Sequence, residues 1–255
     1  MSAIDLYARA SGDFAAKLAE TIEVLKQAAR DDTPITQASS LGAEDMVITH
    51  LIAQTGIDCS VFVLETGMLH AQTLALIDRI EAAYPIKVDV YRPDADAAAD
   101  FVTEFGEQAM YKSVSLRKQC CGIRKMEPLS RALAGKKAWL TGLRREQSSA
   151  RAQVELIEQE AQRVKVNPLA RWTAGDVWHF IALHKIPYNP LHDEFFPSIG
   201  CAPCTRAVTL GEDIRSGRWW WEQESAKECG LHVAGEHASS ATSALSMIPI
   251  KEVTA

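Results

Sequence analysis

The sequence lacks the long apolar runs that would place the protein in a membrane. No stretch of its 255 residues approaches the roughly 20 apolar residues that a membrane-spanning helix needs. The N-terminal residues, Met1 to Arg9, contain neither a basic region nor an apolar region after it. We therefore expect no membrane span and no signal peptide, and we expect the protein to be cytoplasmic.

Cysteine and positive charge are also in short supply. Six cysteines are too few for a disulfide scaffold of this length, so a reducing compartment is expected, where clustered cysteines indicate metal or redox chemistry. The net charge of −6 argues against a general nucleic-acid-binding protein, although it leaves room for a local basic site for a small anion. The remaining composition, with 47% hydrophobic and 24% charged residues, is ordinary for a soluble α/β protein with one large domain or slightly more.

Short apolar runs alternate with amphipathic stretches along the chain. This order predicts a mostly parallel, twisted sheet with helices on both faces, in which a ligand binds beyond the C-terminal ends of the strands. Thr173 is a suitable N-cap for a helix, with Asp176 three residues further on. We expect helices over 13–30, 44–54, 71–84, 95–110 and 173–184, strands over 35–39, 60–64, 86–91 and 137–141, and a hairpin over 154–157 and 163–166.

The chain divides by pattern into three parts. An N-terminal helical segment covers 1–34, an α/β domain covers 35–222, and a C-terminal segment covers 223–255. Residues 233–255 are rich in Ala, Ser and Thr and have no clear periodicity, so we expect them to be mobile.

Four of the cysteines form two close pairs, Cys120–Cys121 and Cys201-Ala-Pro-Cys204. Four thiolates are the usual ligand set of an iron–sulfur cluster. Zinc is the alternative, but side chains on adjacent Cα atoms are poorly placed to reach one small ion, whereas a cubane offers separate iron corners. The charged neighbours of the first pair argue against two core cysteines. The second pair also fits a thioredoxin-like redox motif, but it follows a predicted loop rather than a strand.

The two remaining cysteines have different surroundings. Cys229 lies in Lys-Glu-Cys-Gly-Leu-His, where Lys227 and His232 supply nearby cations that favour a thiolate nucleophile. An idle surface thiol is the alternative for Cys229. Cys59 begins an apolar strand and is expected to be a small buried residue.

Two further patterns indicate a site for an anion. The segment Ser39-Ser40-Leu41-Gly42 follows the first strand and opens a helix, where small residues let backbone N–H groups approach an anion, although a simple capping turn fits the spacing equally well. Arginines follow predicted strand ends or lie beside Gly and Ser, and their planar guanidinium groups match phosphate and sulfate oxygens. A solvated charged face is the alternative. These arginines are Arg144, Arg145, Arg151, Arg171, Arg215 and Arg218.

Together these segments resemble a known family. The segment from Cys120 to Leu129, the Cys201–Cys204 segment and Lys227-Glu-Cys229-Gly-Leu-His232 resemble three signatures of the assimilatory sulfonucleotide reductases, specifically the iron–sulfur branch that reduces adenylyl sulfate (APS). Ser39–Gly42, Leu64-Glu65-Thr66-Gly67 and the segment from Gly142 to Ser148 are similar to the nucleotide-site motifs of that family. The resemblance runs from about residue 35 to residue 232.

The resemblance implies a fold like that of the ATP-pyrophosphatase (PP-loop) superfamily. It also implies reduction of APS to sulfite and AMP by thioredoxin or a glutaredoxin-like reductant, in sulfate assimilation and cysteine biosynthesis, and a homo-oligomer. A [4Fe-4S] cluster would be held by Cys120, Cys121, Cys201 and Cys204. Cys229 would be the nucleophile, and Lys125 would lie between cluster and substrate. The implied substrate contacts are Arg215 and Arg218 on the phosphosulfate, Arg151 as a further anion contact, Arg144 and His232 as weaker ones, and Ser39, Ser40, Gly42, Leu64, Glu65 and Thr66 near ribose and adenine. Glu65 stands where many relatives carry Asp.

Three rival functions remain open at this point. A PAPS reductase acts on the 3′-phosphorylated substrate but generally lacks the four cluster cysteines, while some cluster-bearing relatives accept both substrates. A tRNA-thiolating ligase would need a Ser-Gly-Gly-x-Asp-Ser loop, which Leu41 and Ala43 interrupt, and the acidic net charge disfavours tRNA. A non-catalytic, metal-bearing nucleotide-binding module would leave Cys229 without a role.

Overall fold

A six-stranded sheet in the order β3-β2-β1-β4-β6-β5 forms the centre of the computed structural model, which describes residues 1–223. Five strands are parallel, and only β5 runs antiparallel, against β6. The strands are β1 (Ile35–Ser39), β2 (Cys59–Leu64), β3 (Val88–Tyr91), β4 (Ala138–Leu140), β5 (Ile157–Gln159) and β6 (Val164–Val166).

Alternating side chains of the central strands face two separate cores. Val61 and Val63 belong to the larger core, which also contains buried residues of the helices on that face, while Phe62 points to the opposite face. The larger core is covered by α1 (Ala3–Tyr7), α2 (Phe14–Asp31), α3 (Ala43–Thr55), α4 (Ala71–Ala83) and α9 (Ala174–His184). Leu129 of α8 (Glu127–Ala132) packs on Phe62 and on Trp139 of β4 at the other face. The prediction of a mostly parallel sheet with helices on both faces is therefore confirmed.

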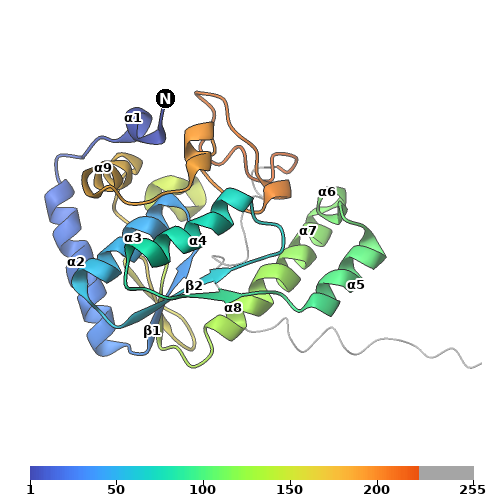
Figure 1. The fold of residues 1–255 in the computed structure, drawn as a ribbon, viewed down its shortest axis with the longest axis horizontal. Helices are drawn as coiled ribbons and strands as arrows, with labels where there is room; N and C mark the ends of the chain where they lie inside the picture. Colours follow the sequence, from blue (N-terminus) through green and yellow to red (C-terminus); the bar gives the residue numbers. More distant parts are fainter. Residues whose placement is uncertain (224–255) are drawn as a thin grey trace, which may run out of the picture.

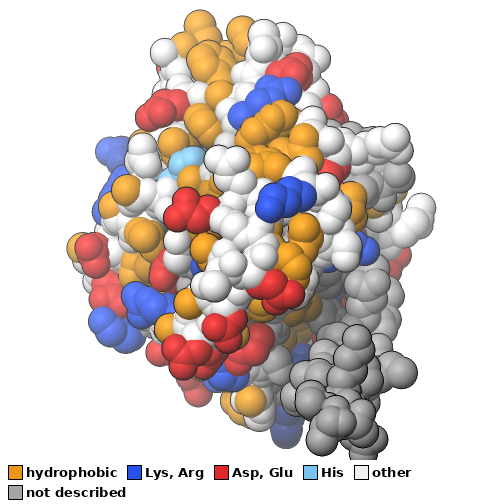
Figure 2. All heavy atoms as spheres, turned by 90° about the vertical axis from the view of Figure 1, so that its right-hand side faces the viewer, with side chains coloured by type: hydrophobic (Ala, Val, Ile, Leu, Met, Phe, Trp, Pro, Cys, Tyr) orange, Lys and Arg blue, Asp and Glu red, His pale blue; other side chains and the backbone are white. Residues whose placement is uncertain are grey.

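A second group of helices extends beside the sheet, at the right of Figure 1. It consists of α5 (Ala95–Phe105), α6 (Ala109–Lys112) and α7 (Val114–Cys121). One π-helical turn, Gly122–Met126, joins α7 to α8 without a loop. π-helical turns of this kind occur frequently at functional sites. On the face seen in Figure 2, hydrophobic, acidic and basic side chains are interspersed.

Local sequence explains where several helices begin and end. The Thr173 hydroxyl accepts a hydrogen bond from the Asp176 backbone N–H, and the Asp176 carboxylate accepts one from the Thr173 N–H, so the predicted N-cap forms a complete capping box at α9. Helix α3 ends at Gly56, whose φ of 66° places it in the left-handed region that favours glycine. None of the helices formed within residues 1–223 is long and apolar enough to cross a bilayer.

The structure corrects three expected boundaries. The helix expected over 95–110 ends at Phe105, because Gly106 has a φ of 88°, and a separate short helix follows. The first hairpin strand lies at Ile157–Gln159 rather than over 154–157, since Val154 is held in a turn by its N–H bond to the Arg151 carbonyl. Strand β3 starts at Val88, two residues later than expected, and α1, α7 and α8 were not expected.

The three-part division of the chain stays a prediction. Leu25 and Ala28 of the N-terminal segment lie in the same core as the strands. The expected mobility of residues 233–255 concerns a segment outside the described residues.

Candidate active site

A cavity of about 270 Å³ opens at the C-terminal ends of β1, β2 and β4. We call it the main cavity. The chain turns from β1 toward β2 and β3 on one side and later adds β4 on the other, so the strand order reverses between β1 and β4. Ligands of open α/β sheets bind in the crevice at such a reversal. The location matches the expectation from the sequence.

One end of the main cavity is apolar. Its lining includes three buried residues of the smaller core, Phe62, Leu129 and Trp139, together with Ala38 and Leu64. Flat apolar walls of this kind suit a planar base, which stacks and buries its faces there.

The loop between β1 and α3 forms a polar wall of the main cavity. Leu41 is buried and has a φ of 61°, an uncommon conformation for a residue with a side chain. This turn brings Ser39, Ser40 and Gly42 to the cavity lining. Ser40 donates from its backbone N–H and from its hydroxyl to Asp45 Oδ2, at 2.7 and 2.6 Å.

Asp45 is an unusual carboxyl in this loop. Burial raises the pKa of Asp45 to about 6, and the neighbouring Glu44 carboxylate adds to the rise, although Ser40 opposes it. Its second oxygen, Oδ1, faces Gly142 but makes no hydrogen bond of normal geometry. A carboxyl that titrates near neutrality is therefore part of the cavity wall.

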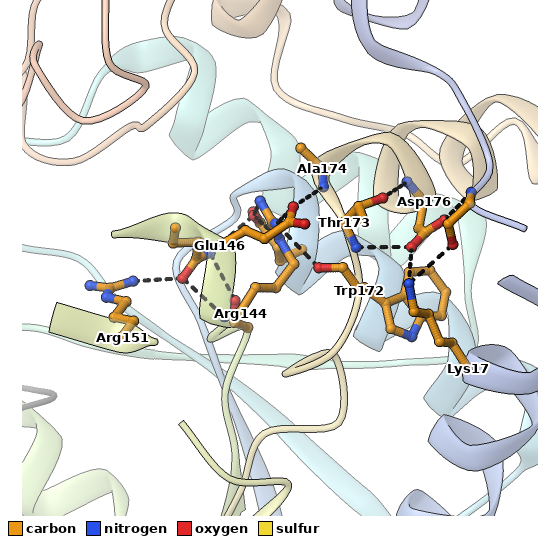
Figure 3. A network of polar contacts seen from close by, with 12 residues as sticks. Lys17, Arg144, Glu146, Arg151, Trp172, Thr173, Ala174 and Asp176 are labelled. Carbon is orange, nitrogen blue, oxygen red and sulfur yellow. Dashed lines mark hydrogen bonds and ion pairs between the residues drawn. The ribbon is translucent and has the colours of Figure 1, made fainter. Parts of the chain in front are cut away.

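Arg144 is buried beside this loop and its guanidinium is occupied by protein groups. It donates to Glu44 Oε1 at 2.9 Å and to the Trp172 carbonyl at 3.3 Å. Burial acts to raise the pKa of Glu44, but Arg144 and Gln147 outweigh burial and hold it below its usual value. Figure 3 shows this network continuing through Thr173 and Asp176 to Lys17 of α2. Arg144 thus stabilises the cavity wall from within the protein.

The cationic end of the main cavity begins beside the apolar end, because Lys125 lies four residues, about one helical turn, before Leu129. Lys125 lies on the π-helical turn, and Arg215 and Arg218 lie in the segment that follows the Cys201–Cys204 pair. Arg218 is 8% exposed, donates to the Ile199 carbonyl at 3.2 Å, and stacks over the Trp219 ring at 4.7 Å. Arg151 also lines the cavity, held by a 2.7 Å bond to Gln147. This end suits an anion.

A second, small cavity adjoins the cationic end, and all four paired cysteines line it. We call it the cysteine cavity. Its lining includes Cys120, Cys121, Cys201 and Cys204. The two pairs, some eighty residues apart in sequence, are brought together by the end of α7 and by a bridge between Leu69 and Cys201. Lys125, Arg218 and Trp219 line both cavities.

Hydrogen bonds join the cysteines to the loop after β2. The Thr66 hydroxyl lies 3.3 Å from Cys201 Sγ, and Arg124 donates to the Thr66 carbonyl at 2.8 Å. Burial raises the pKa of Cys204 to about 12, and Cys201 adds to the rise. Burial also raises the pKa of Cys120.

The donor set fits a cluster better than a single ion. Within residues 1–223 no three His, Cys, Asp or Glu side chains are grouped so that they could hold one metal ion. The four cysteines nevertheless surround one buried cavity whose other polar residues are Arg117, Arg124, Lys125 and Arg218. A cluster with four separate irons does not require its thiolates to converge on one point, and the cations offset its negative charge.

The structure brings most of the predicted site residues together. Glu65 is an exception because its side chain does not line the main cavity. Its carboxylate accepts a 2.6 Å bond from the Gly67 N–H and pairs with Arg92 at 3.3 Å. Cys229 and His232 lie outside the described residues. The main cavity contains Ser39, Ser40, Gly42, Leu64, Thr66, Lys125, Arg144, Arg151, Arg215 and Arg218.

Several residues of the site were not selected from the sequence. His192 is buried and lines the main cavity, and Trp219 separates the two cavities. Arg117 is 1% exposed, stacks on Trp219 at 4.6 Å and makes a two-bond ion pair with the buried Glu222. The sequence signal beside His192 is the Asn189-Pro190 turn, which indicates a loop and does not by itself indicate a binding residue.

Comparisons with known proteins agree with this geometry. The sequence profile described as "Phosphoadenosine phosphosulfate reductase domain" matches residues 34–207. A protein of Allochromatium vinosum named adenosine 5′-phosphosulfate reductase is 51% identical over 216 residues, or 84% of each chain. A protein of the same name from Burkholderia cepacia is 49% identical over 223 residues, which cover 87% of this chain and 89% of the relative.

Solved structures lead to the same group. A phosphoadenylyl-sulfate reductase from Candida auris, solved as a phosphate complex, is 26% identical and covers 79% of this chain and all of that one, with a TM-score of 0.63. An FMN adenylyltransferase from Candida glabrata, 14% identical, covers 87% of this chain and 80% of its own with a TM-score of 0.52, which shows a shared fold alone. On the strength of the profile and of the relatives near 50% identity, the chain belongs to the phosphoadenosine phosphosulfate reductase family.

Proposed function

We propose that the protein reduces adenosine 5′-phosphosulfate to sulfite and AMP with electrons from a dithiol protein of the thioredoxin type. The names of its relatives near 50% identity support this substrate. The observation that carries the proposal is the pair of adjoining cavities. Lys125 and Arg218 line both the cavity that suits a nucleotide and the cavity surrounded by four cysteines.

The shape of the main cavity gives an orientation for the substrate. The adenine occupies the apolar end, against Phe62 and Trp139. The phosphosulfate extends to the cationic end, where Lys125, Arg215 and Arg218 offset its negative charge. The same cations reduce the repulsion between the sulfuryl oxygens and an incoming thiolate. The reacting sulfur therefore lies beside the cysteine cavity.

The nucleophile in this proposal is the Cys229 thiolate. It attacks the sulfur of APS, an S–S bond forms, and the S–O bond to AMP breaks with its electron pair leaving on the AMP phosphate. A thioredoxin thiolate then attacks Cys229 Sγ and expels sulfite, and the second thioredoxin thiol resolves the mixed disulfide. The dithiol supplies two electrons and releases two protons, so the reaction balances.

Cys120, Cys121, Cys201 and Cys204 would hold a [4Fe-4S] cluster in the cysteine cavity. When bound, the cluster supplies a fixed charge and a rigid frame rather than an exchanged electron. Lys125 lines both cavities and would be held in place by this frame. Lys125 and Arg218 would then stay in position to bind the phosphosulfate.

The metal content tests the cluster directly. Protein purified without oxygen should be brown, with a broad absorption band near ~400 nm and four irons per chain. Cys201→Ser should lose the colour and the iron, whereas Cys59→Ser, a matched change outside the cavity, should keep both. Colourless protein with stoichiometric zinc would contradict the cluster.

Mass spectrometry tests the nucleophile. Incubation of the protein with APS and no thioredoxin should leave a stable adduct on Cys229 with the mass of a sulfonate. Cys229→Ser should form no adduct and should retain its iron, which separates the nucleophile from the cluster ligands. An adduct on Cys229→Ser would show that another residue attacks the substrate.

Two alternatives give different results in the same assays. A PAPS reductase, or an enzyme with dual specificity, would show kcat/KM for PAPS equal to or above that for APS, and the four cysteines favour APS. A non-catalytic nucleotide-binding module would bind AMP tightly and form neither adduct nor sulfite. A homo-oligomer and residence in the cytoplasm remain part of the proposal, and sedimentation in the presence of AMP measures the first.

A further inference from the structure

His192 is a buried side chain of the main cavity whose ring nitrogens, Nδ1 and Nε2, make no well-formed hydrogen bond within the described part of the protein. It lies in the 3₁₀ helix Pro190–Glu194, is 5% exposed, and lines the cavity. A buried polar atom without a partner costs about 1–3 kcal/mol, so the arrangement is unfavourable unless a ligand completes it.

The surrounding residues hold the imidazole ring in this position. The Trp178 ring packs against it in an edge-on contact, with 5.1 Å between centroids. The His192 N–H donates to the Asn189 carbonyl at 3.1 Å, and the Asn189 side chain donates to Thr73 at 2.8 Å. Trp178 therefore covers one side of the ring, and the turn that carries His192 is anchored to α4 through Asn189.

The electrostatics of this wall define the ligand group that it accepts. Burial lowers the pKa of His192, although Glu44 and a backbone contact at Phe196 oppose the change, so burial favours the neutral ring. A neutral imidazole offers one donor and one acceptor. The Glu44 carboxylate is already engaged by Arg144 and Gln147. An uncharged group that can both donate and accept, such as a hydroxyl, matches this wall.

The position of His192 indicates which part of the nucleotide it would bind. Trp178 belongs to the core on the α3 and α9 face of the sheet, while the apolar end that suits adenine belongs to the core on the α8 face. The cations for the phosphosulfate lie at a third place, on the wall shared with the cysteine cavity. Since the adenine and the phosphosulfate are assigned to other parts of the cavity, the ribose hydroxyls are the groups of the nucleotide that would contact His192.

We propose that His192 is a substrate-binding residue that hydrogen-bonds a ribose hydroxyl of the bound nucleotide. The proposal rests on the proposed function for the identity of the nucleotide. It makes His192 a determinant of specificity for ribonucleotides over deoxyribonucleotides. No covalent step involves this residue.

Binding of AMP and its deoxy analogues tests the proposal without any turnover. Calorimetry on the full chain, purified without oxygen, would compare AMP, 2′-deoxy-AMP and 3′-deoxy-AMP in the wild type and in His192→Phe, which keeps a ring but removes both nitrogens. We expect the wild type to bind AMP about tenfold more tightly than one of the deoxy analogues, the cost of one hydrogen bond to a buried group. His192→Phe should bind AMP about tenfold more weakly and should no longer distinguish that analogue.

Two further variants make the result specific. His192→Gln, which keeps a donor and an acceptor, should restore part of the discrimination. His50→Phe, a histidine on α3 that contacts Tyr84 and does not line the main cavity, should behave as the wild type. The proposal is wrong if His192→Phe weakens all three ligands by the same factor, because the ring would then act by packing alone. If the wild type binds no AMP, the nucleotide site of the proposed function fails first.

Discussion

Gly200 is the residue at which one added methyl group should most directly disturb the anion site. A Cβ atom built on Gly200 would lie 2.5 Å from Arg218 Nη2 and 2.6 Å from its Cζ, whereas ordinary contacts begin at 3.4 Å. Gly200→Ala must therefore push the guanidinium away by about 1 Å. Arg218 would leave its stacked position, 4.7 Å from the Trp219 centroid, and its bond to the Ile199 carbonyl.

The expected cost follows from the proposed role of Arg218 at the phosphosulfate. A misplacement of about 1 Å in a positioning group can cost roughly 10²-fold in rate, which corresponds to about 2.7 kcal/mol of lost transition-state stabilisation. We expect kcat/KM for APS to fall by about this factor in Gly200→Ala. AMP lacks the sulfate, so its affinity should change by less than about threefold.

Steady-state sulfite release and AMP calorimetry measure the two effects, and iron content confirms that the neighbouring Cys201 is undisturbed. Gly12→Ala is the matched control, because a Cβ there meets nothing within 4 Å. The double variant with Arg218→Ala should be no slower than Arg218→Ala alone, since both changes remove the same group. Additive losses, or a Gly200→Ala enzyme within twofold of the wild type, would refute the reasoning.

Three other predictions concern stability. Burial raises the pKa of Asp45 from 3.8 to about 6, so the folded state binds the carboxyl proton more tightly than the unfolded state does. The free energy of unfolding of the wild type should therefore fall by up to about 3 kcal/mol as the pH rises through the window between these two values. Asp45→Asn lacks this titration, so urea unfolding should show its stability relative to wild type improving from pH 4 to pH 7, and a constant difference would contradict the raised pKa. Arg117→Ala leaves the Glu222 carboxylate buried and unpaired, which should cost about 3–5 kcal/mol in the same assay, with partial recovery in the double variant with Glu222→Gln. Gly175→Ala places a Cβ 2.3 Å from the Arg9 carbonyl oxygen and should lower Tm by several degrees, because backbone cannot yield as a side chain does.

The sheet was predictable because its signal is local. Apolar runs such as Val61 to Val63, followed by amphipathic helices, specify βα units without knowledge of distant residues. Helix α7 has no such signal, since only Arg117 and Cys120 of its eight residues are buried. An arginine is not read as a core residue, and this one is buried because Glu222, 105 positions further along the chain, pairs with it. Tertiary contact, not periodicity, forms this helix.

The site was predictable in its residue types and not in its contacts. The cysteine pairs and the arginines were found from spacing and chemistry. Their convergence depends on pairings such as Leu69 with Cys201, which no local pattern reports. His192 shows the same limit, because a histidine after an Asn-Pro turn reads as a surface residue until Trp178 is seen to cover it. Arg144 stays a predicted substrate contact, since it lines the main cavity while it donates to Glu44.

The Arg117–Glu222 pair fixes the point at which the chain leaves the described structure. Trp219 lies between the guanidinium groups of Arg117 and Arg218, at 4.6 and 4.7 Å, so one contact chain joins Glu222 to the cationic wall. The chain leaves the described structure one residue after Glu222. Cys229 is seven residues beyond Glu222, and seven residues span at most about 25 Å. Anchoring Glu222 to Arg117, which lines the cysteine cavity, therefore keeps the proposed nucleophile Cys229 within about 25 Å of that anchor, and this tether raises its effective concentration at the site.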